Sequence, residues 1–375
     1  MRVVHISTGL GNGGSEGMLY RICKEHNKSL NQQIHVINLS NNNWYESKLK
    51  KIGIKVHKIY FKKKISDIFQ IIVLTKLLIK LKPDIIQTWM YHANLIGGVL
   101  GYCFTKAKII WNIRHTKVSF KFSKLSTILV VNLLSFMSLR IPKKIIYCSL
   151  ESKKVHEDKN YDKKKGVFIP NGYDNTFFYS KFIRNSFRAK YKLKKNNFVV
   201  GLAARYHKEK NFKNLINAFN NFSKKNSKAL LYLKGKNVSI KNHNLRKNLS
   251  TISKNKFKLI NNSKNILDFM NGIDLFVLPS FSESFPNVLA EAMLCETPCI
   301  STNVGSAKDI IKNTDGSIVP IDDSFALSMA IEKKYRIFKE KKKWNIIKKK
   351  SRKKIINNYN IKDISSKYLN LWKKI

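Results

Sequence analysis

Short apolar segments alternate with longer helical patterns along most of this 375-residue chain. A first series of apolar segments covers residues 3–7, 34–39, 84–88, 108–113 and 145–149, and a second covers residues 198–203, 230–233, 257–260, 275–279 and 299–302. Short strands that alternate with helices are typical of a parallel sheet with helices on both faces. The sequence therefore predicts an α/β fold with two doubly wound, Rossmann-like parallel sheets, one for each series.

The length of the chain favours two domains. With 375 residues, of which 43% are hydrophobic, it is too long for one ordinary core. The polar and basic stretch 179–197 is interpreted as a linker, which gives a first domain over residues 1–180 and a second over residues 181–355. We expect the helical segment of about 356–375 to pack back on the first domain. Two doubly wound domains in tandem also predict a ligand cleft between them, at the carboxyl ends of the strands.

The charge of the chain raises the question of a nucleic-acid partner, because the formal net charge is +49 at pH 7. Subtracting ten arginines from the 72 basic residues leaves 62 lysines, which are spread along the whole chain. Arginine, the usual reader of bases, is not enriched, and we expect no nucleic-acid partner. Most of the lysines are interpreted as solvated surface that attracts anionic membranes or other polyanions.

The N-terminus and the cysteines indicate a compartment. The apolar start of the chain is a predicted strand without the basic segment and cleavage site of a signal peptide, and no apolar run is long enough to span a bilayer. The five cysteines lack the spacing of a zinc site, so they are interpreted as small core residues in a reducing compartment. We expect a cytoplasmic protein, whose basic surface permits peripheral contact with the inner face of an anionic membrane.

A glycine-rich loop follows the first predicted strand. Gly9, Gly11 and Gly14 fit the spacing G-x-G-x-x-G between a strand and a helix, which is the context of dinucleotide binding. However, the second strand ends in residues 39–41 without the acidic residue that holds a ribose. Two interpretations remain, a tight strand–helix connection or a close approach of the backbone to a phosphate or a sugar.

Two cations lie at the start of the second series. Arg205 follows the strand 198–203, and Lys210 stands just before the next helical pattern. A guanidinium can grip a diphosphate with two hydrogen bonds, so the pair is a candidate diphosphate site. The alternative is a pair of surface side chains on a loop.

The segment 280–293, SFSESFPNVLAEAM, places two acids at the start of a helix. Pro286 suits the first helical turn, and a helix N-terminus attracts anions. Glu283 and Glu291 would repel a free anion, but their carboxylates can accept hydrogen bonds from hydroxyl groups. A ligand with phosphate at one end and hydroxyl groups at the other fits both features.

Two histidines and a turn complete the candidates. His92 and His115 follow consecutive predicted strands, so both belong at the carboxyl edge of the first sheet, as site residues or as local hydrogen-bonding partners. The segment 168–172, FIPNG, is first a turn signal. No Asp-x-Asp follows a strand, and we therefore predict no metal ion that clamps a nucleotide sugar.

The apolar segment 125–139 is shorter than the roughly 20 residues that span a bilayer. We expect a buried helix here, although its basic flanks permit contact with a membrane interface. The basic cluster 48–64 is interpreted in the same two ways, as a solvated face or as a membrane-surface patch.

Taken together, these residues give a chain that resembles a retaining glycosyltransferase of family 4, with the GT-B fold of two facing Rossmann-like domains. The resemblance covers nearly the whole length. The residues that carry it are Gly13, Gly14, His115, Pro170, Asn171, Gly172, Arg205, Lys210, Glu283 and Glu291. Asn261 stands where the family commonly has a glycine. The segments 91–94 and 113–116 resemble those of members that build surface polysaccharide or lipid-linked glycans.

The resemblance implies a role for each candidate. The second domain would bind a nucleotide-sugar donor, a UDP-hexose or a UDP-N-acetylhexosamine, and the first would lie on the acceptor side. Arg205 and Lys210 would bind the diphosphate in place of a metal, Glu291 the ribose and Glu283 the donor sugar. The other substrate-binding candidates are Gly13, Gly14, His92, Asn171, Phe285, Pro286, Asn287 and Val288, and His115 would lie near the donor sugar and the acceptor hydroxyl.

The reaction that the resemblance implies is front-face substitution, in which the departing phosphate helps to deprotonate the acceptor. No cofactor is expected, and the acceptor would be a glycan or a lipid-linked glycan. A nucleotide-sugar 2-epimerase or hydrolase on the same fold is the alternative enzyme. A basic polyanion-binding protein is the alternative without catalysis, but the arginines are too few and too scattered to favour it.

Overall fold

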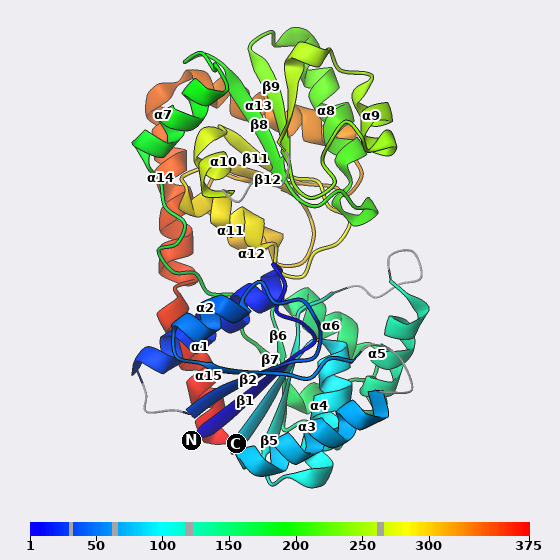
Figure 1. Cartoon of the computed structure of the whole chain (residues 1–375). Helices are drawn as coiled ribbons and strands as arrows, with labels where there is room; N and C mark the ends of the chain where they lie inside the picture. Colours follow the sequence, from blue (N-terminus) through cyan, green and yellow to red (C-terminus); the bar gives the residue numbers. More distant parts are fainter. Residues whose placement is uncertain (30–32, 62–66, 117–122, 261–265) are drawn as a thin grey trace. The chain divides into compact units, whose positions relative to one another are not determined.

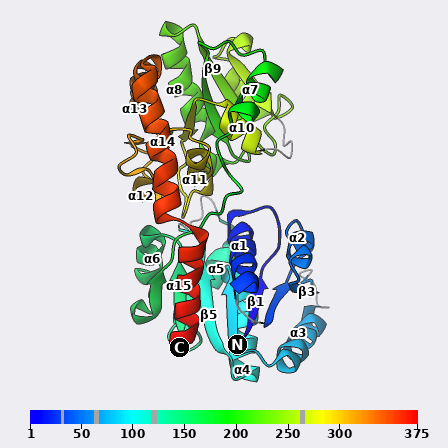
Figure 2. The same cartoon turned by 90° about the vertical axis from the view of Figure 1, so that its left-hand side faces the viewer.

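The computed structural model describes residues 1–29, 33–61, 67–116, 123–260 and 266–375. The chain divides into two compact units (Figures 1 and 2). Unit 1 consists of Met1–Asp174 and Tyr359–Ile375, and unit 2 consists of Asn175–Asn358. The C-terminal segment therefore returns to the unit in which the chain begins.

Unit 1 is built on a parallel sheet with the strand order β3-β2-β1-β4-β5-β6-β7 in the part of the chain that the structure describes. Its strands are β1 (Arg2–Ser7), β2 (Gln33–Asn38), β3 (Lys55–Lys58), β4 (Ile85–Trp89), β5 (Lys108–Ile113), β6 (Lys144–Tyr147) and β7 (Gly166–Phe168). The order reverses at β1, because β2 and β4 pair on its two sides. Loops that follow β1 and β4 therefore meet at a switch point, where such folds bind ligands.

Helices cover both faces of the unit 1 sheet, which confirms a doubly wound fold. They are α1 (Gly14–Ser29), α2 (Glu46–Lys51), α3 (Asp67–Leu81), α4 (Tyr91–Phe104), α5 (Leu125–Met137), α6 (Leu150–Glu157), the short η1 (Lys163–Lys165) and α15 (Ile361–Lys374). One core joins side chains of α1 and α15 to the sheet, and a second core joins those of α3, α4 and α5. Successive residues such as Val3 and Val4 belong to different cores, because side chains alternate between the faces of a strand.

The helix α15 is tied to unit 1 by packing and by hydrogen bonds (Figure 2). Trp372 Nε1 donates to Gln87 Oε1 at 2.8 Å in the interior of the unit. At the start of the helix, a Cβ added to Gly172 would lie 2.9 Å from the Cα of Ile361. Glycine is therefore required at this position for the close approach of α15.

Unit 2 contains a second parallel sheet with the order β10-β9-β8-β11-β12-β13 among the described residues. Its strands are β8 (Phe198–Ala203), β9 (Ala229–Lys234), β10 (Phe257–Ile260), β11 (Leu275–Leu278), β12 (Cys299–Thr302) and β13 (Ser317–Val319). Its helices are α7 (Lys181–Lys190), η2 (Lys208–Lys210), α8 (Phe212–Lys225), α9 (His243–Leu249), η3 (Lys254–Lys256), α10 (Ile266–Gly272), α11 (Asn287–Leu294), α12 (Ala307–Ile311), α13 (Ser324–Lys339) and α14 (Lys341–Asn358). The prediction of two doubly wound, Rossmann-like parallel sheets is confirmed.

The prediction of a linker over residues 179–197 is wrong, because this stretch contains α7. Arg188 donates to Asp274 Oδ2 at 3.1 Å, and Arg184 donates to the other carboxylate oxygen. The Asp274 side chain is fully buried and also accepts from the backbone N–H of Val199 at 2.8 Å. The basic residues that suggest a solvated linker thus form a buried ion-pair network with an acid from the sheet.

The prediction of a helix over residues 125–139 is confirmed by α5, but the prediction that this helix is buried is wrong. Within α5, Val131 and Leu134 are buried, but a second set of large apolar side chains faces solvent, among them Leu129 and Phe136. The sequence shows apolar residues on all sides of the helix but not that the unit offers a core on one side of the helix only. In the described part of the chain, no helix is both long and apolar enough to cross a membrane.

Candidate active site

Three side chains form a cluster at the carboxyl edge of the unit 2 sheet. Lys210 Nζ donates to Glu283 Oε1 at 2.6 Å, and Ser280 Oγ donates to the same oxygen at 2.8 Å. Both side chains of the ion pair are largely buried, with 19% of Lys210 and 14% of Glu283 exposed. Within the described residues, the second oxygen of Glu283, Oε2, has no hydrogen bond. That oxygen remains able to accept from a ligand.

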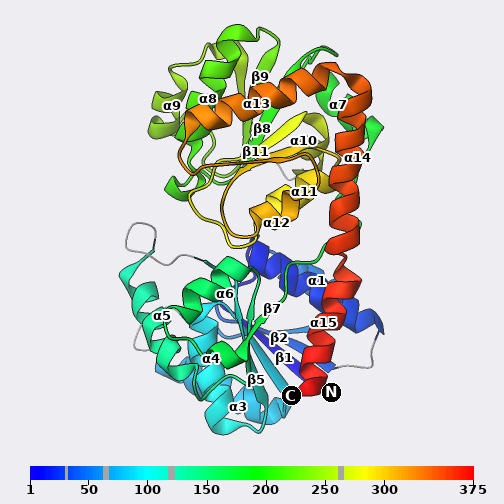
Figure 3. The same cartoon turned by 180° about the vertical axis from the view of Figure 1, so that it is seen from behind.

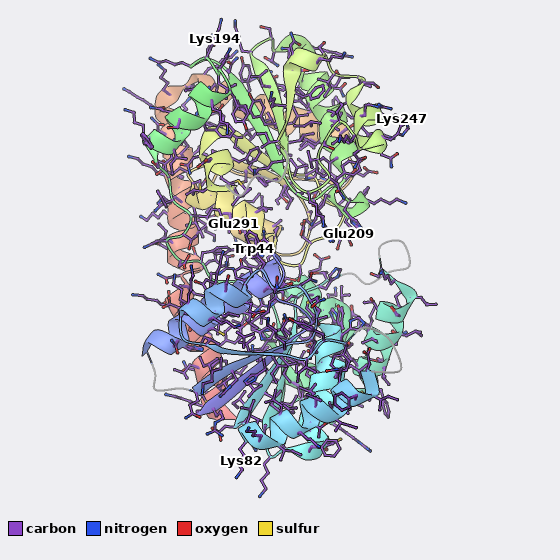
Figure 4. The ribbon with its side chains drawn as sticks, viewed as in Figure 1. Trp44, Lys82, Lys194, Glu209, Lys247 and Glu291 are labelled. Atoms are coloured by element: carbon purple, nitrogen blue, oxygen red, sulfur yellow. The ribbon has the colours of Figure 1, made fainter. Side chains whose placement is uncertain are left out.

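Local backbone structure brings the two sides of the ion pair together. Lys210 ends the η2 turn, which follows β8, and Glu283 lies in the loop that follows β11. The backbone N–H of Phe281 donates to the carbonyl of Glu209 at 2.8 Å and joins the two loops. Asn211 has the left-handed φ of 44° and caps α8 with its side chain, which turns the chain directly after Lys210. Glu209 and Glu291 lie at one end of unit 2 in Figure 4.

Two glycines allow the neighbouring loops to approach the cluster. Gly235, after β9, has a φ of +152°, and an added Cβ would lie 1.9 Å from the carbonyl oxygen of Ala204. Gly305, after β12, has a φ of +50°, and an added Cβ would lie 2.1 Å from the carbonyl oxygen of Ser284. No side chain fits at either position, so the loops around Arg205 and Glu283 are held by direct backbone contact.

The helix α11 begins beside the cluster. Pro286 is the residue before its first turn rather than the first helical residue, and the described residues provide no side-chain cap. The first turn, which includes Asn287 and Val288, therefore presents the positive end of the helix dipole without a capping acid. Phe285 is buried and anchors the segment, and Glu291 lies one turn farther along the helix.

Arg205 lies at the same edge, two residues after β8, and is exposed. The residue before it, Ala204, contacts the loop at Gly235 through its carbonyl oxygen. The structure thus places the predicted residues of the second domain at one sheet edge. It brings Lys210 and Glu283 into direct contact and leaves Arg205 open to solvent.

In unit 1, the glycine loop joins β1 directly to α1. The described loop glycines lack positive φ values, so the loop does not depend on left-handed turns. Instead, side chains close over it: an added Cβ would lie 2.8 Å from Ser40 Oγ at Gly9 and 2.5 Å from Glu16 Oε2 at Gly13. Burial raises the pKa of the Glu16 carboxyl. The loop thus lies against a carboxyl group that takes up a proton more readily than an exposed one.

The two histidines lie at one edge of the unit 1 sheet. Trp89 of β4 pairs with Asn112 of β5, and His92 and His115 each follow three residues later. His92 is held by a tight connection, in which Met90 alone separates β4 from α4 and adopts a φ of 74°. A non-glycine residue seldom adopts this conformation, and it stores strain next to the site.

A chain of hydrogen bonds supports His115. Ser152 Oγ donates to the carbonyl of His115 at 2.7 Å, and His156 Nδ1 lies 2.7 Å from the carbonyl of Ser152. Burial lowers the pKa of His156 to about 4, so its ring is neutral at pH 7. Because Nδ1 donates to a carbonyl, Nε2 accepts from the Tyr91 hydroxyl at 2.8 Å. The position of His115 thus depends on helix α6.

Asn171 is buried, with 2% of the residue exposed, and its Oδ1 accepts a hydrogen bond from Arg114. Arg114 also donates to the hydroxyl of Tyr368 in α15 and lies 5.1 Å from the centre of the Trp89 ring. The turn 168–172 therefore holds Arg114 in place through Asn171 and allows the close approach of α15 at Gly172. Asn171 thus affects the edge of the sheet only through Arg114.

Sequence reasoning missed four residues of these two edges, Glu16, Arg114, Ser280 and Gly305. Glu16 and Ser280 each lie within three residues of a predicted site residue, but single polar residues in a loop carry no distinguishing pattern. Gly305, in the segment Asn303-Val304-Gly305 after a strand, had the clearest signal, because glycine in such a position indicates a close backbone approach.

The described residues contain no group of three or more His, Cys, Asp or Glu that could hold a metal ion. Asn261, where the family pattern has a glycine, lies outside the described residues.

Comparison with known sequences finds a family-model match that lies mainly in unit 2. Residues 183–361 match the family model of glycosyl transferases group 1. The chain is 27% identical over 286 residues to the capsular polysaccharide biosynthesis glycosyltransferase CapM of Staphylococcus aureus, covering 72% of this chain and 71% of CapM. It is also 27% identical over 269 residues to the UDP-Gal:alpha-D-GlcNAc-diphosphoundecaprenol alpha-1,3-galactosyltransferase of Escherichia coli, covering 69% and 68% of the two chains.

Solved structures share the whole fold. Alr3699/HepE of Anabaena, solved in complex with UDP and glucose, matches with a TM-score of 0.86 at 17% identity over 100% of both chains. WaaG, a glycosyltransferase involved in lipopolysaccharide biosynthesis, matches with a TM-score of 0.72 at 11% identity over 99% of both. The comparisons do not favour an epimerase, a hydrolase or a non-enzymatic protein. The two Rossmann-like parallel sheets give the chain the GT-B fold of these solved structures, and the group 1 match over residues 183–361 together with both curated relatives supports a glycosyltransferase.

Proposed function

We propose that the chain is a retaining, metal-independent glycosyltransferase of the family 4 type, which acts in surface polysaccharide biosynthesis. Its donor is a UDP-hexose or a UDP-N-acetylhexosamine, and its acceptor is a glycan or a lipid-linked glycan. The observation that carries the proposal is the Lys210–Glu283–Ser280 cluster at the carboxyl edge of the unit 2 sheet. The names of the S. aureus and E. coli relatives support the pathway and the UDP-sugar class, and Alr3699/HepE has been solved with UDP-glucose.

The donor diphosphate binds to fixed positive groups of unit 2. The Lys210 ammonium uses one N–H for Glu283 and keeps two for phosphate oxygens. Arg205 contributes a bidentate guanidinium, and Phe285, Asn287 and Val288, which lead into and open α11, contribute backbone N–H groups. These groups stabilise the charge that develops on the leaving phosphate, which is the task that a metal ion performs in other transferases.

The two acids bind the hydroxyl groups of the donor. Glu283 Oε1 is occupied by Lys210 and Ser280, so Oε2 accepts a hydrogen bond from a hydroxyl of the donor sugar. Glu291, one turn into α11, accepts from the ribose hydroxyls. An acid that is already paired with a lysine adds less negative charge near the diphosphate than a free acid would.

Unit 1 supplies the acceptor-side groups. Its candidate binding groups are the backbone at Gly13 and Gly14 and the side chains of His92 and His115. Asn171 contributes by holding Arg114.

In the reaction, the bond between the anomeric carbon and the phosphate oxygen breaks, and the acceptor oxygen bonds to the same face of that carbon. The proton of the acceptor hydroxyl passes to the departing phosphate oxygen. The configuration at the anomeric carbon is therefore retained. A lipid-linked acceptor would also explain a cytoplasmic enzyme that works peripherally at the inner face of the membrane.

The test is a transfer assay with purified protein in EDTA. UDP-glucose, UDP-galactose and their N-acetylated counterparts are supplied as donors, with N-acetylglucosaminyl-diphosphoundecaprenol as the acceptor probe. We expect one donor to yield product with the anomeric configuration of the donor, measured by NMR, and Glu283→Gln to abolish it. Inverted configuration, or activity only when a divalent cation is added, would contradict the proposal.

A further inference from the structure

Helix α5 exposes a continuous apolar stripe. Leu125, Leu129, Leu133 and Phe136, with Leu139 just after the helix, are between 44% and 71% exposed. They are spaced by four, four, three and three residues, so at about 100° per residue they stay within about 120° of the helix circumference. The opposite side of the same helix is buried in the unit 1 core through Val131 and Leu134. The stripe is therefore a surface feature of a well-packed helix.

Neighbouring helices expose further apolar side chains. Figures 1 and 3 show α4 between α3 and α5 on one side of unit 1. On α3, Ile68, Phe69 and Ile72 are exposed, and Tyr102 and Phe104 are exposed at the end of α4. We call these exposed side chains of α3, α4 and α5 the α3–α5 surface. An exposed apolar stripe with further exposed apolar side chains on the adjacent helices is typical of an interaction site.

Charges around the α3–α5 surface are mainly positive, although Asp67 lies in the first turn of α3. The sequence from residue 85 to residue 150 contains nine lysines and arginines and no aspartate or glutamate. Lys124 and Arg140 flank α5 and are exposed, as are Lys76 and Lys80 on α3. Apolar side chains surrounded by cations complement an anionic lipid surface, in which acyl chains lie beneath negative headgroups.

We propose that the α3–α5 surface docks unit 1 on an anionic bilayer, with α5 lying in the interface and its leucines inserted among the headgroups. A second copy of this chain fits less well, because a symmetric contact would bring two cationic rims together. The inference deepens the proposed function, since it names the surface that brings the enzyme to a lipid-linked acceptor, but its test measures no sugar transfer.

The first test is co-sedimentation with vesicles of phosphatidylcholine, with and without phosphatidylglycerol. The variant Leu129→Ser/Leu133→Ser/Phe136→Ser changes exposed side chains only. Its matched control, Phe182→Ser/Phe325→Ser/Met329→Ser, changes unit 2 side chains that are 80%, 71% and 53% exposed. We expect the partitioning of the α5 variant to anionic vesicles to fall by about tenfold or more, because it lacks the apolar side chains that would be buried in the bilayer. The control should bind like the unaltered protein.

A native cysteine offers a second readout. Of the five cysteines, all within the described residues, Cys103 alone is exposed, and it lies on α4 between Tyr102 and Phe104. An environment-sensitive fluorophore on Cys103 should shift to the blue on binding anionic vesicles. Unchanged vesicle binding of the α5 variant, or co-sedimentation without a fluorescence shift, would overturn the proposal.

Two further measurements distinguish membrane docking from dimerisation, and the membrane surface from the nucleotide site. If the α5 variant converts a dimer to a monomer in gel filtration and binds vesicles normally, the α3–α5 surface joins two copies and the proposal is wrong. The α5 variant should be stabilised by UDP to the same extent that we expect for the unaltered protein. A protein that binds vesicles through this surface but no nucleotide would refute the proposed function and leave the membrane surface intact.

Discussion

Lys210 Nζ and Glu283 Oε1 lie 2.6 Å apart, although 73 residues separate them in the sequence. The contact exists because β8 and β11 are neighbours in the sheet, so that the loops after them meet at one edge. It leaves two N–H groups of Lys210 and one oxygen of Glu283 for a ligand that carries both phosphate and hydroxyl groups.

Replacing Lys210 tests the role of this contact. Lys210→Ala should lower kcat/KM for the donor by about 10²–10³-fold, because a preorganised donor to the leaving phosphate is lost. Lys208→Ala, which removes an exposed lysine of the same η2 turn, is the control and should change kcat/KM by less than about twofold. The measurement is steady-state kinetics of both variants. Equal losses of kcat/KM in the two variants would show that the overall charge, and not the contact between Lys210 and Glu283, supports activity.

The approach of the β9 loop to Ala204 predicts the effect of a single methyl group. Gly235→Ala should destabilise unit 2 by at least about 2 kcal/mol, since the left-handed backbone and the contact with Ala204 both disfavour a Cβ. Urea unfolding followed by circular dichroism measures this loss. Gly11→Ala, where the nearest atom to the added Cβ is 3.5 Å away, should shift the free energy of unfolding by no more than about 0.5 kcal/mol.

Asp274 anchors α7 to the unit 2 sheet, so its charge should matter for stability. Asp274→Asn leaves Arg184 and Arg188 without a carboxylate in a buried network, and we expect a loss of about 3–5 kcal/mol. In the control Glu340→Gln, the lost partner Lys343 is exposed, and the change should stay below about 1 kcal/mol. A loss for Asp274→Asn no greater than for Glu340→Gln would mean that α7 is held by its apolar side chains alone.

The buried side chain of His156 should make the free energy of unfolding depend on pH. Burial lowers its pKa from the ordinary value of 6.5 to about 4 in the folded protein. As the pH falls, His156 therefore takes up its proton in the unfolded chain before it does so in the folded protein. The contribution of its neutral, buried ring to the free energy of unfolding is complete above pH 6.5 and is lost as the pH falls toward 4. The full effect is on the order of 3 kcal/mol. In His156→Gln, the difference in unfolding free energy between pH 7 and pH 4.5 should shrink, and an unchanged difference would exclude His156 as its source.

The strands were the most predictable part of the fold. Buried parallel strands such as β1 and β8 consist almost entirely of apolar residues, and their helices follow at regular intervals. The edge strand β3 escaped prediction because its end residues, Lys55 and Lys58, are exposed. β7 escaped because it has three residues. In both cases a neighbouring strand, rather than the local sequence, determines the conformation.

Helices α5 and α7 show where sequence patterns mislead. In α5, apolar residues on all sides suggest burial, but only one side meets the core. In α7, the basic residues suggest solvent, but two of them meet the buried Asp274. Whether a side chain finds a partner depends on the fold around it.

The candidate site was predictable by type and position along the chain. Arg205, Lys210 and Glu283 each follow a strand, and the topology alone brings them to one edge. The direct pairing of Lys210 with Glu283, the hydrogen bond from Ser280 and the support of Asn171 to Arg114 required coordinates.

The most direct test of the central claim is thermal unfolding of the purified protein with UDP, GDP or ADP in the presence of EDTA. A ligand that binds only the folded state raises its stability. We predict that UDP raises the melting temperature without a divalent cation, and that Glu291→Ala, but not Glu340→Ala, abolishes the rise. If no nucleotide stabilises the protein, while DNA or RNA does so at low salt only, the account of a metal-independent donor site in unit 2 is contradicted.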